Sequence, residues 1–220
     1  MKSVINNLRV KICGMREPEN IHAVASLQPD FMGFIFYEYS TRHVSDESGL
    51  SRDLVESLMG KGITPVAVCV NASFDEVLAV VRKYSFTAVQ LHGTETPADC
   101  LRLMGEGLTV FKAFPVAVKD DVTLSAAYDG CCSYFLFDTK NALPGGSGSQ
   151  FDWTVLQAYS GKTPFFLSGG LDLDSAAAVR AFCHPLLCGF DLNSRFEFAP
   201  GLKDASRLKA FIDQLSERDC

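Results

Sequence analysis

The sequence lacks the features that would place it in a membrane or in an oxidising compartment. None of its apolar runs approaches the ~20 residues that a helix needs to cross a bilayer, and the N-terminal MKSVINNLRV does not read as a signal peptide. Its 8 cysteines include no Cys-x-x-Cys and no Cys/His cluster with zinc-site spacing, so no metal site is expected. We therefore expect a cytoplasmic protein without a membrane partner, in which most cysteines are small buried hydrophobic residues.

Positive charge is also scarce. The 220 residues carry 26 acidic and 20 basic side chains, which gives a net charge of −6. This balance argues against a nucleic acid or an anionic membrane surface as a partner. It does not exclude a phosphorylated small molecule, because helix N-termini bind phosphate through backbone N–H groups without needing net positive charge.

What the sequence does contain is a series of eight short apolar runs, most of which end in a small, polar or ionisable residue. The gaps between them are long enough for a loop, a helix and the next strand, so strand and helix alternate along the chain. Eight such units in roughly 200–250 residues predict an α/β fold, a single (β/α)8 TIM barrel domain over residues 1–220. The strands are expected to end near Cys13, Phe36, Asn71, His92, Phe114, Asp138, Gly169 and Asp191.

Several of the connecting helices can be located individually. Ser73 and Glu76 form a capping box ahead of an apolar stripe, and Pro18 has the position that a first helical turn tolerates. Such stripes are typical of helices that pack against a barrel wall. The stripe closest to the C-terminus consists of Leu208, Phe211, Ile212 and Leu215.

The carboxyl ends of barrel strands meet at one mouth, where active sites lie. Cys13 ends the first run, and a thiol there can act as nucleophile or general base if a cation or helix terminus lowers its pKa; the alternative is a buried structural cysteine. Asp138 ends the sixth run against apolar residues, which favour a protonated general acid. Asp191 ends the eighth run in the same way. Position alone does not choose between them, because carboxylates at strand ends also serve as helix caps or hydrogen-bond anchors.

The last two runs carry a pattern that suits phosphate. Gly169 and Gly170 follow the seventh run, and Asn193 and Ser194 follow the eighth. In many TIM barrels a phosphate binds between these two loops, on backbone N–H groups. The paired glycines would remove side chains that block the anion, although a tight turn into a helix has the same composition.

Two connections are long enough to predict binding or lid loops. The first runs from Phe36 to about Asp46 and contains Arg42, which could pair with a substrate carboxylate or be a solvated surface arginine. His92, at the end of the fourth run, is a candidate site residue, although histidines commonly pack at strand ends. The second connection, from Thr139 to Trp153, is either a functional loop or an ordinary surface loop. Its glycines, which permit close approach to a ligand, are Gly145, Gly146 and Gly148.

Seven segments, in order and with matching spacing, are similar to the motifs of one family. They are KICGM (11–15), GFIFYEYSTRHV (33–44), VCVN (68–71), VQLHG (89–93), FDTK followed by GGSGSQFDW, PFFLSGGL, and GFDLNSRFE followed by PGLKD. Together these segments resemble the phosphoribosylanthranilate isomerase family of the tryptophan pathway, over nearly the whole chain.

The resemblance implies an Amadori rearrangement of N-(5-phosphoribosyl)anthranilate to 1-(2-carboxyphenylamino)-1-deoxyribulose 5-phosphate. It implies that Cys13 is the catalytic base, that Asp138 is the catalytic acid and that Arg42 contacts the anthranilate carboxylate. His92 and Asp191 are expected to bind the substrate, a phosphorylated small molecule. Because the reaction involves no redox change and no external nucleophile, neither a metal nor an organic cofactor is expected. The chain is expected to be a monomer or a homodimer.

The sequence departs from the family pattern at two places. The second motif commonly has a proline and a lysine where this chain has Glu38 and Tyr39, and Thr41 replaces a frequent proline. A glycine commonly follows the serine of the eighth-strand motif, where this chain has Arg195. We expect the first group to change the stiffness of its loop, and Arg195 to alter the phosphate loop.

Two alternatives remain from the sequence alone. The first is another phosphosugar barrel. An indole-glycerol-phosphate synthase would need a catalytic lysine, for which Lys112 is available, but the N-terminal extension expected of such a synthase is lacking. The histidine-pathway sugar isomerase would need aspartates at the ends of strands one and five, where this chain has Cys13 and an apolar end near Phe114. A catalytically silent barrel that only binds ligands is the other. Loss of the acid or the base would favour it, yet both are present.

Overall fold

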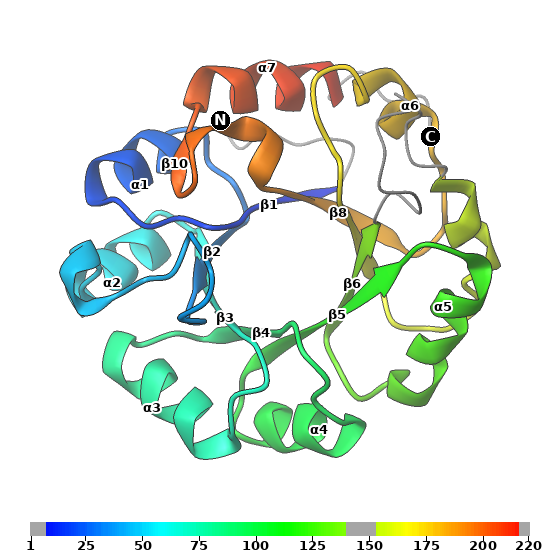
Figure 1. Cartoon of the computed structure of the whole chain (residues 1–220), viewed down its shortest axis with the longest axis horizontal. Coiled ribbons are helices and arrows are strands. Elements are labelled where there is room, and N and C mark those ends of the chain that lie inside the picture. Colours follow the sequence, from blue (N-terminus) through cyan, green and yellow to red (C-terminus); the bar gives the residue numbers. More distant parts are fainter. Residues whose placement is uncertain (1–7, 140–152, 216–220) are drawn as a thin grey trace.

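The computed structural model describes residues 8–139 and 153–215. Eight parallel strands form a closed barrel in the order β1-β2-β3-β4-β5-β6-β7-β8, and β8 pairs with β1 to complete the ring. The helices lie outside the ring of strands (Figure 1). The predicted (β/α)8 architecture is therefore confirmed.

The strands follow the apolar runs closely, and each ends within two residues of its predicted end. Their bounds are β1 Arg9–Ile12, β2 Phe31–Ile35, β3 Thr64–Cys69, β4 Ala88–Leu91, β5 Thr109–Val116, β6 Tyr134–Thr139, β7 Phe165–Ser168 and β8 Leu187–Leu192.

Among the helices of the barrel, α5 and α6 are the short ones, with 5 and 6 residues. Their bounds are α1 Pro18–Ala25, α2 Arg52–Gly60, α3 Phe74–Tyr84, α4 Pro97–Gly105, α5 Lys119–Thr123, α6 Ala176–Ala181 and α7 Ala205–Leu215. Short 3-10 helices complete the connections, at Asp46–Ser48, Leu124–Tyr128, Trp153–Ala158 and Ser194–Phe196. A small hairpin, β9 (Glu197–Ala199) and β10 (Leu202–Lys203), follows the barrel and precedes α7.

Local sequence signals explain where the predicted helices begin and what they bury. The Ser73 side chain accepts from the backbone N–H of Glu76, and the Glu76 carboxylate accepts from the backbone N–H of Ser73, so the capping box of α3 is confirmed. Pro18 is the first residue of α1. The predicted stripe of α7 is fully buried against the barrel, at Leu208, Phe211, Ile212 and Leu215.

Toward the amino ends of the strands, four aromatic side chains fill the barrel interior and are called the aromatic plug here. They are Phe31, Phe111, Tyr134 and Phe166. Every pair of these rings has a centroid separation between 4.9 and 6.2 Å. They point inward because alternate residues of a strand face opposite sides of the sheet. The guanidinium of Arg9 lies 5.3 Å from the Tyr134 ring centroid, within reach of a cation–π interaction. The barrel is therefore filled, and ligand space remains at its carboxyl end.

Truncation of the plug should destabilise the protein. Phe111 is fully buried, so Phe111→Ala is expected to lower the free energy of unfolding by about 3–5 kcal/mol through lost burial and a residual cavity. Urea denaturation measures the change. The matched control is Leu101→Ala on the outer face of α4, where the side chain is 49% exposed and the effect should stay within about 0.5 kcal/mol. Equal effects of the two substitutions would contradict the packing described here.

Candidate active site

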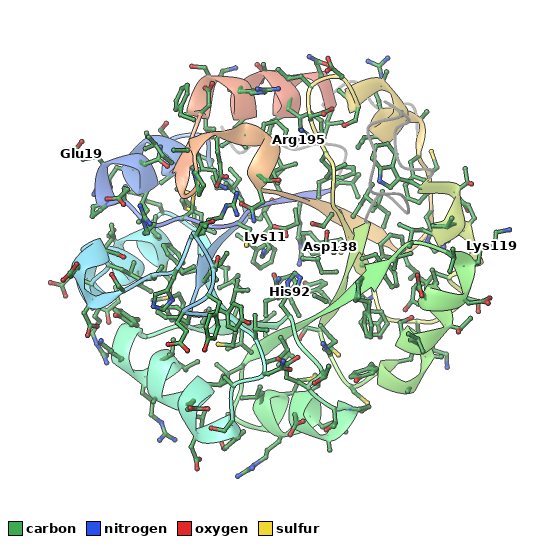
Figure 2. The ribbon with its side chains drawn as sticks, viewed as in Figure 1. Lys11, Glu19, His92, Lys119, Asp138 and Arg195 are labelled. Carbon is green, nitrogen blue, oxygen red and sulfur yellow. The ribbon has the colours of Figure 1, made fainter. Side chains whose placement is uncertain are left out.

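Above the plug, the inward-facing positions change from aromatic to polar. They surround a cavity of about 210 Å³ at the carboxyl ends of the strands. Figure 2 shows Lys11, His92 and Asp138 pointing toward the centre of the ring from different strands. The cavity brings together all the predicted catalytic, substrate-binding and phosphate-binding residues, which are Cys13, Arg42, His92, Asp138, Gly169, Gly170, Asp191, Asn193 and Ser194.

A buried ion pair joins the first and last strands of the barrel. Lys11 and Asp191 are partners in the pairing of β1 with β8, and Lys11 Nζ lies 2.8 Å from Asp191 Oδ1. The side chains are 0% and 5% exposed. Burial lowers the pKa of Lys11, but the nearby Asp191 and Cys13 outweigh burial and hold that pKa above its ordinary value. Asp191 therefore anchors Lys11 through a hydrogen bond, which is one of the roles left open for a carboxylate at a strand end.

The Cys13 thiol is buried directly after β1, beside this pair. Burial raises the pKa of Cys13, while the charges of Lys11 and Lys203 and a hydrogen bond from Lys11 act in the opposite direction. The predicted cationic neighbour is therefore present, although burial outweighs it. Gly33 on β2 gives the thiol its space, because a Cβ at that position would lie 2.7 Å from Cys13 Sγ.

Asp138 enters the cavity from β6, across the barrel from Cys13. Its Oδ2 lies 3.6 Å from Nε2 of His92, and the two side chains are 24% and 38% exposed. The apolar residues of β6 form the plug and wall below the carboxyl group. The carboxyl group itself faces His92 and a cavity that both polar residues and the apolar Ile35, Val68 and Leu171 line.

Gln90 is a site residue that the sequence analysis missed. It is fully buried on β4, and its Nε2 lies 2.8 Å from Nδ1 of His92. When the amide N–H donates to Nδ1, the ring proton of His92 resides on Nε2, facing Asp138. The amide oxygen of Gln90 is buried without a hydrogen-bond partner among the described residues. A polar residue at an inward position of the strand AVQL was the available signal.

Arg42 is held by a second buried charge cluster. Its Nε lies 2.9 Å from Oε1 of Glu197 and its Nη2 lies 2.6 Å from Oε2, which is a two-point contact. Lys203 Nζ donates to the same carboxylate at 2.6 Å and to Asn193 Oδ1 at 2.7 Å. Arg42 is therefore a positioned group rather than a solvated surface arginine. Glu197 and Lys203 were missed as site residues, although both lie in motifs that the resemblance uses.

Gly14 allows the loop after β1 to approach this cluster. Its φ is +78°, a conformation that favours glycine. A Cβ there would lie 2.7 Å from Arg42 Cδ and 2.8 Å from Asn193 Oδ1. A side chain at this position would therefore displace both groups.

The loops after β7 and β8 border the same cavity, as predicted for a phosphate site. Gly169 and Gly170 have positive φ values of 85° and 67°, and they lie opposite Asn193 and Ser194. Within residues 8–139 and 153–215, no group of three or more His, Cys, Asp or Glu side chains is placed to hold a metal ion. The glycines expected in a binding or lid loop, Gly145, Gly146 and Gly148, lie outside the described residues.

Lys112, the lysine that a synthase of the indole-glycerol-phosphate type would use, does not line the cavity. Its ammonium is buried outside the ring, 3.1 Å from Glu95 Oε2 and 2.7 Å from the carbonyl oxygen of Gly93. These contacts give it a structural role.

None of the helices within the described residues has the length and apolar character that a membrane span requires.

The fold and the site define a TIM-barrel enzyme whose cavity holds a thiol, a carboxyl group and, in the loops after the last two strands, paired glycines. The family model described as N-(5′-phosphoribosyl)anthranilate (PRA) isomerase matches residues 10–214. The chain belongs to the N-(5′-phosphoribosyl)anthranilate isomerase family, which confirms the resemblance found in its motifs.

Individual relatives cover nearly all of the chain. The N-(5′-phosphoribosyl)anthranilate isomerase of Parabacteroides distasonis is 45% identical over 94% of this chain and 92% of its own length. That of Caulobacter vibrioides is 37% identical over 92% and 93%. Among solved structures, phosphoribosyl anthranilate isomerase from Thermotoga maritima superimposes with a TM-score of 0.79, at 32% identity, over 94% of this chain and 98% of that one. Another such isomerase, in complex with reduced 1-(o-carboxyphenylamino)-1-deoxyribulose 5-phosphate, has a TM-score of 0.78 at 29% identity, over 94% and 98%.

The Arg42–Glu197–Lys203 cluster should make stability depend on pH. Burial raises the pKa of Glu197, but hydrogen bonds from Arg42 and Lys203 outweigh it and lower the pKa below the ordinary 4.5. A lowered pKa stabilises the fold above pH 4.5, and this contribution is lost as the pH falls through the folded-state value. Glu197→Gln should therefore cost about 3–5 kcal/mol at neutral pH, because the buried Lys203 and the partly buried Arg42 lose their counter-charge.

Urea denaturation of wild type and Glu197→Gln, from neutral pH to below pH 4.5, checks this expectation. The difference between the two should shrink as the pH falls. The matched control is Glu106→Gln at the exposed end of α4, which should follow wild type throughout. A Glu197→Gln effect that is the same at every pH would contradict the charge cluster.

Proposed function

We propose that Cys13 and Asp138 carry out the Amadori rearrangement of N-(5′-phosphoribosyl)anthranilate as general base and general acid. The rearrangement is a step of tryptophan biosynthesis, and the chain is an isomerase of that family. The observation that carries the proposal is the shared cavity: the thiol enters from β1 and the carboxyl group from β6, so a sugar between them is reached from two sides.

The reaction divides into proton transfers by Asp138 and Cys13. Asp138 donates a proton to the furanose oxygen, the C1′–O bond breaks and a protonated Schiff base forms. Cys13 then removes the proton from C2′, which gives an enolamine. The Cys13 thiol returns a proton to C1′ and the Asp138 carboxylate takes the proton of the C2′ hydroxyl, which gives the ketone and restores both groups. A correctly placed acid or base typically contributes ~10²- to 10⁴-fold to the rate. Because no electrons are exchanged and no external nucleophile enters, this chemistry needs no metal or organic cofactor.

Cys13 must be a thiolate to accept the proton. Burial opposes this form, and Lys11 favours it through its charge and a hydrogen bond. The protonated Schiff base adds a second positive charge next to the thiol when proton transfer occurs. The thiolate form of Cys13 is therefore favoured when the C2′ proton is removed. Asp191 keeps Lys11 in place beside it.

The remaining groups have binding roles in this proposal. Arg42, oriented by Glu197, pairs with the anthranilate carboxylate. The phosphate binds to backbone N–H groups of Gly169, Gly170, Asn193 and Ser194. His92 and Asp191 bind the sugar, and Nε2 of His92 faces the Asp138 carboxyl group at 3.6 Å.

The proposed reaction also bears on the partners, the oligomeric state and the location of the chain. The partner is a phosphorylated small molecule, and neither a nucleic acid nor a membrane is required. A solved structure of a relative is described as monomers generated from the dimeric Thermotoga maritima isomerase, which supports a monomer or homodimer here. We place the chain in the cytoplasm, as one barrel domain over residues 1–220.

Substitution of either catalytic group should abolish turnover while leaving binding largely intact. Cys13→Ser and Asp138→Asn are each expected to lower kcat by about 10²- to 10⁴-fold, measured by the loss of substrate fluorescence. Complementation of cells that lack this isomerase provides an independent readout. The matched control is Cys69→Ala, since Cys69 is an equally buried cysteine at the end of β3 that does not line the cavity. Near-wild-type turnover by Cys13→Ser or Asp138→Asn would refute the role assigned to that residue.

A further inference from the structure

Arg195 is a cationic side chain at the edge of the cavity, and no described residue provides a counter-charge for it. It is exposed in the 3-10 helix that follows β8, and Figure 2 shows it on this segment at the rim of the ring. It lines the cavity together with Gly169, Gly170 and Ser194. Among the described residues, nothing makes a hydrogen bond or an ion pair with its guanidinium.

The other cations around the cavity are already neutralised. Lys11 is paired with Asp191 at 2.8 Å. Arg42 and Lys203 share the Glu197 carboxylate, each at 2.6 Å. With Asp138 protonated as the acid and Cys13 ionised as the base, three cations face two carboxylates and one thiolate, so Arg195 supplies the excess positive charge that a phosphorylated ligand needs.

The space next to Arg195 is open. A Cβ added to Gly170 would meet no atom within 4 Å, and its φ of +67° is a conformation that side chains rarely adopt. An anion can therefore approach the backbone here without displacing protein atoms. A guanidinium at the edge of such a space can donate two parallel hydrogen bonds to phosphate oxygens.

We propose that Arg195 binds the phosphate group of the substrate and raises the affinity of this chain for it. The phosphate is then held by a side-chain charge in addition to backbone N–H groups. This inference rests on the proposed function for the location of the phosphate.

Steady-state kinetics of Arg195→Met and Arg195→Lys tests the inference. Arg195→Met should raise KM for N-(5′-phosphoribosyl)anthranilate and the inhibition constant of inorganic phosphate by about 2- to 20-fold, as expected for a charge-assisted hydrogen bond from an exposed side chain. The value of kcat should change less than about twofold, because uniform binding acts on KM. Arg195→Lys keeps the charge but loses the two-point contact, so it should fall between Met and wild type.

The matched control is Arg82→Met, which removes one exposed arginine from the end of α3, outside the cavity. It makes the same change in net charge and should leave both constants unchanged. Unchanged constants in Arg195→Met, or equal changes in the two Met variants, would overturn the inference.

Binding of ribose 5-phosphate, measured by isothermal titration calorimetry, separates this inference from the proposed function. The measurement needs no turnover. Weaker binding by Arg195→Met than by wild type and Arg82→Met supports the phosphate contact even if the wild-type chain fails to isomerise its substrate. Equal binding by all three proteins overturns the contact even if catalysis is normal.

Discussion

The active site depends on the ion pair between Lys11 and Asp191, which lies where the barrel closes. The two residues are register partners on β1 and β8, so their 2.8 Å contact links the first and last strands. Burial of two charges carries a desolvation cost, and loss of one partner would leave the other charge uncompensated. The pair therefore persists only while the barrel is closed. The Cys13 thiol, two residues after Lys11, lies next to the ammonium only in this arrangement.

The second charge cluster, formed by Arg42, Glu197 and Lys203, orients a side chain that comes from a loop. Arg42 comes from a long loop after β2, where a free guanidinium would adopt many conformations. The Glu197 carboxylate contacts two of its nitrogens and also accepts from Lys203, so loop and hairpin are held together at the rim. Glycines make both clusters possible: Gly33 leaves space for the thiol, and Gly14 leaves space for Arg42. Charges and small residues together define a site whose own positive and negative charges nearly cancel. The additional charge of Arg195 therefore changes the electrostatic potential in the cavity.

Much of this arrangement could be predicted from the sequence. The apolar runs fixed the strand ends because alternation and run length are local properties, and barrel topology then brought Cys13, Asp138 and the paired glycines to one mouth. The pairing of Arg42 with Glu197 could not be predicted, because 155 positions separate them and the hairpin lies outside the barrel repeat. The raised pKa of Cys13 reflects a balance between burial and two lysines, which requires coordinates. The contact of Asp191 with Lys11 could have been predicted, because Lys11 and Cys13 share one face of β1 and Asp191 lies on β8, which closes the barrel against β1.

A crystal structure of this chain with reduced 1-(o-carboxyphenylamino)-1-deoxyribulose 5-phosphate, the ligand of a related isomerase, tests the central claim most directly. The account predicts that the sugar lies between the Cys13 thiol and the Asp138 carboxyl group, with the thiol in contact with C2′. The phosphate should lie against Gly169 and Gly170. A ligand that binds elsewhere, or that contacts the two groups from the same side, would contradict the account.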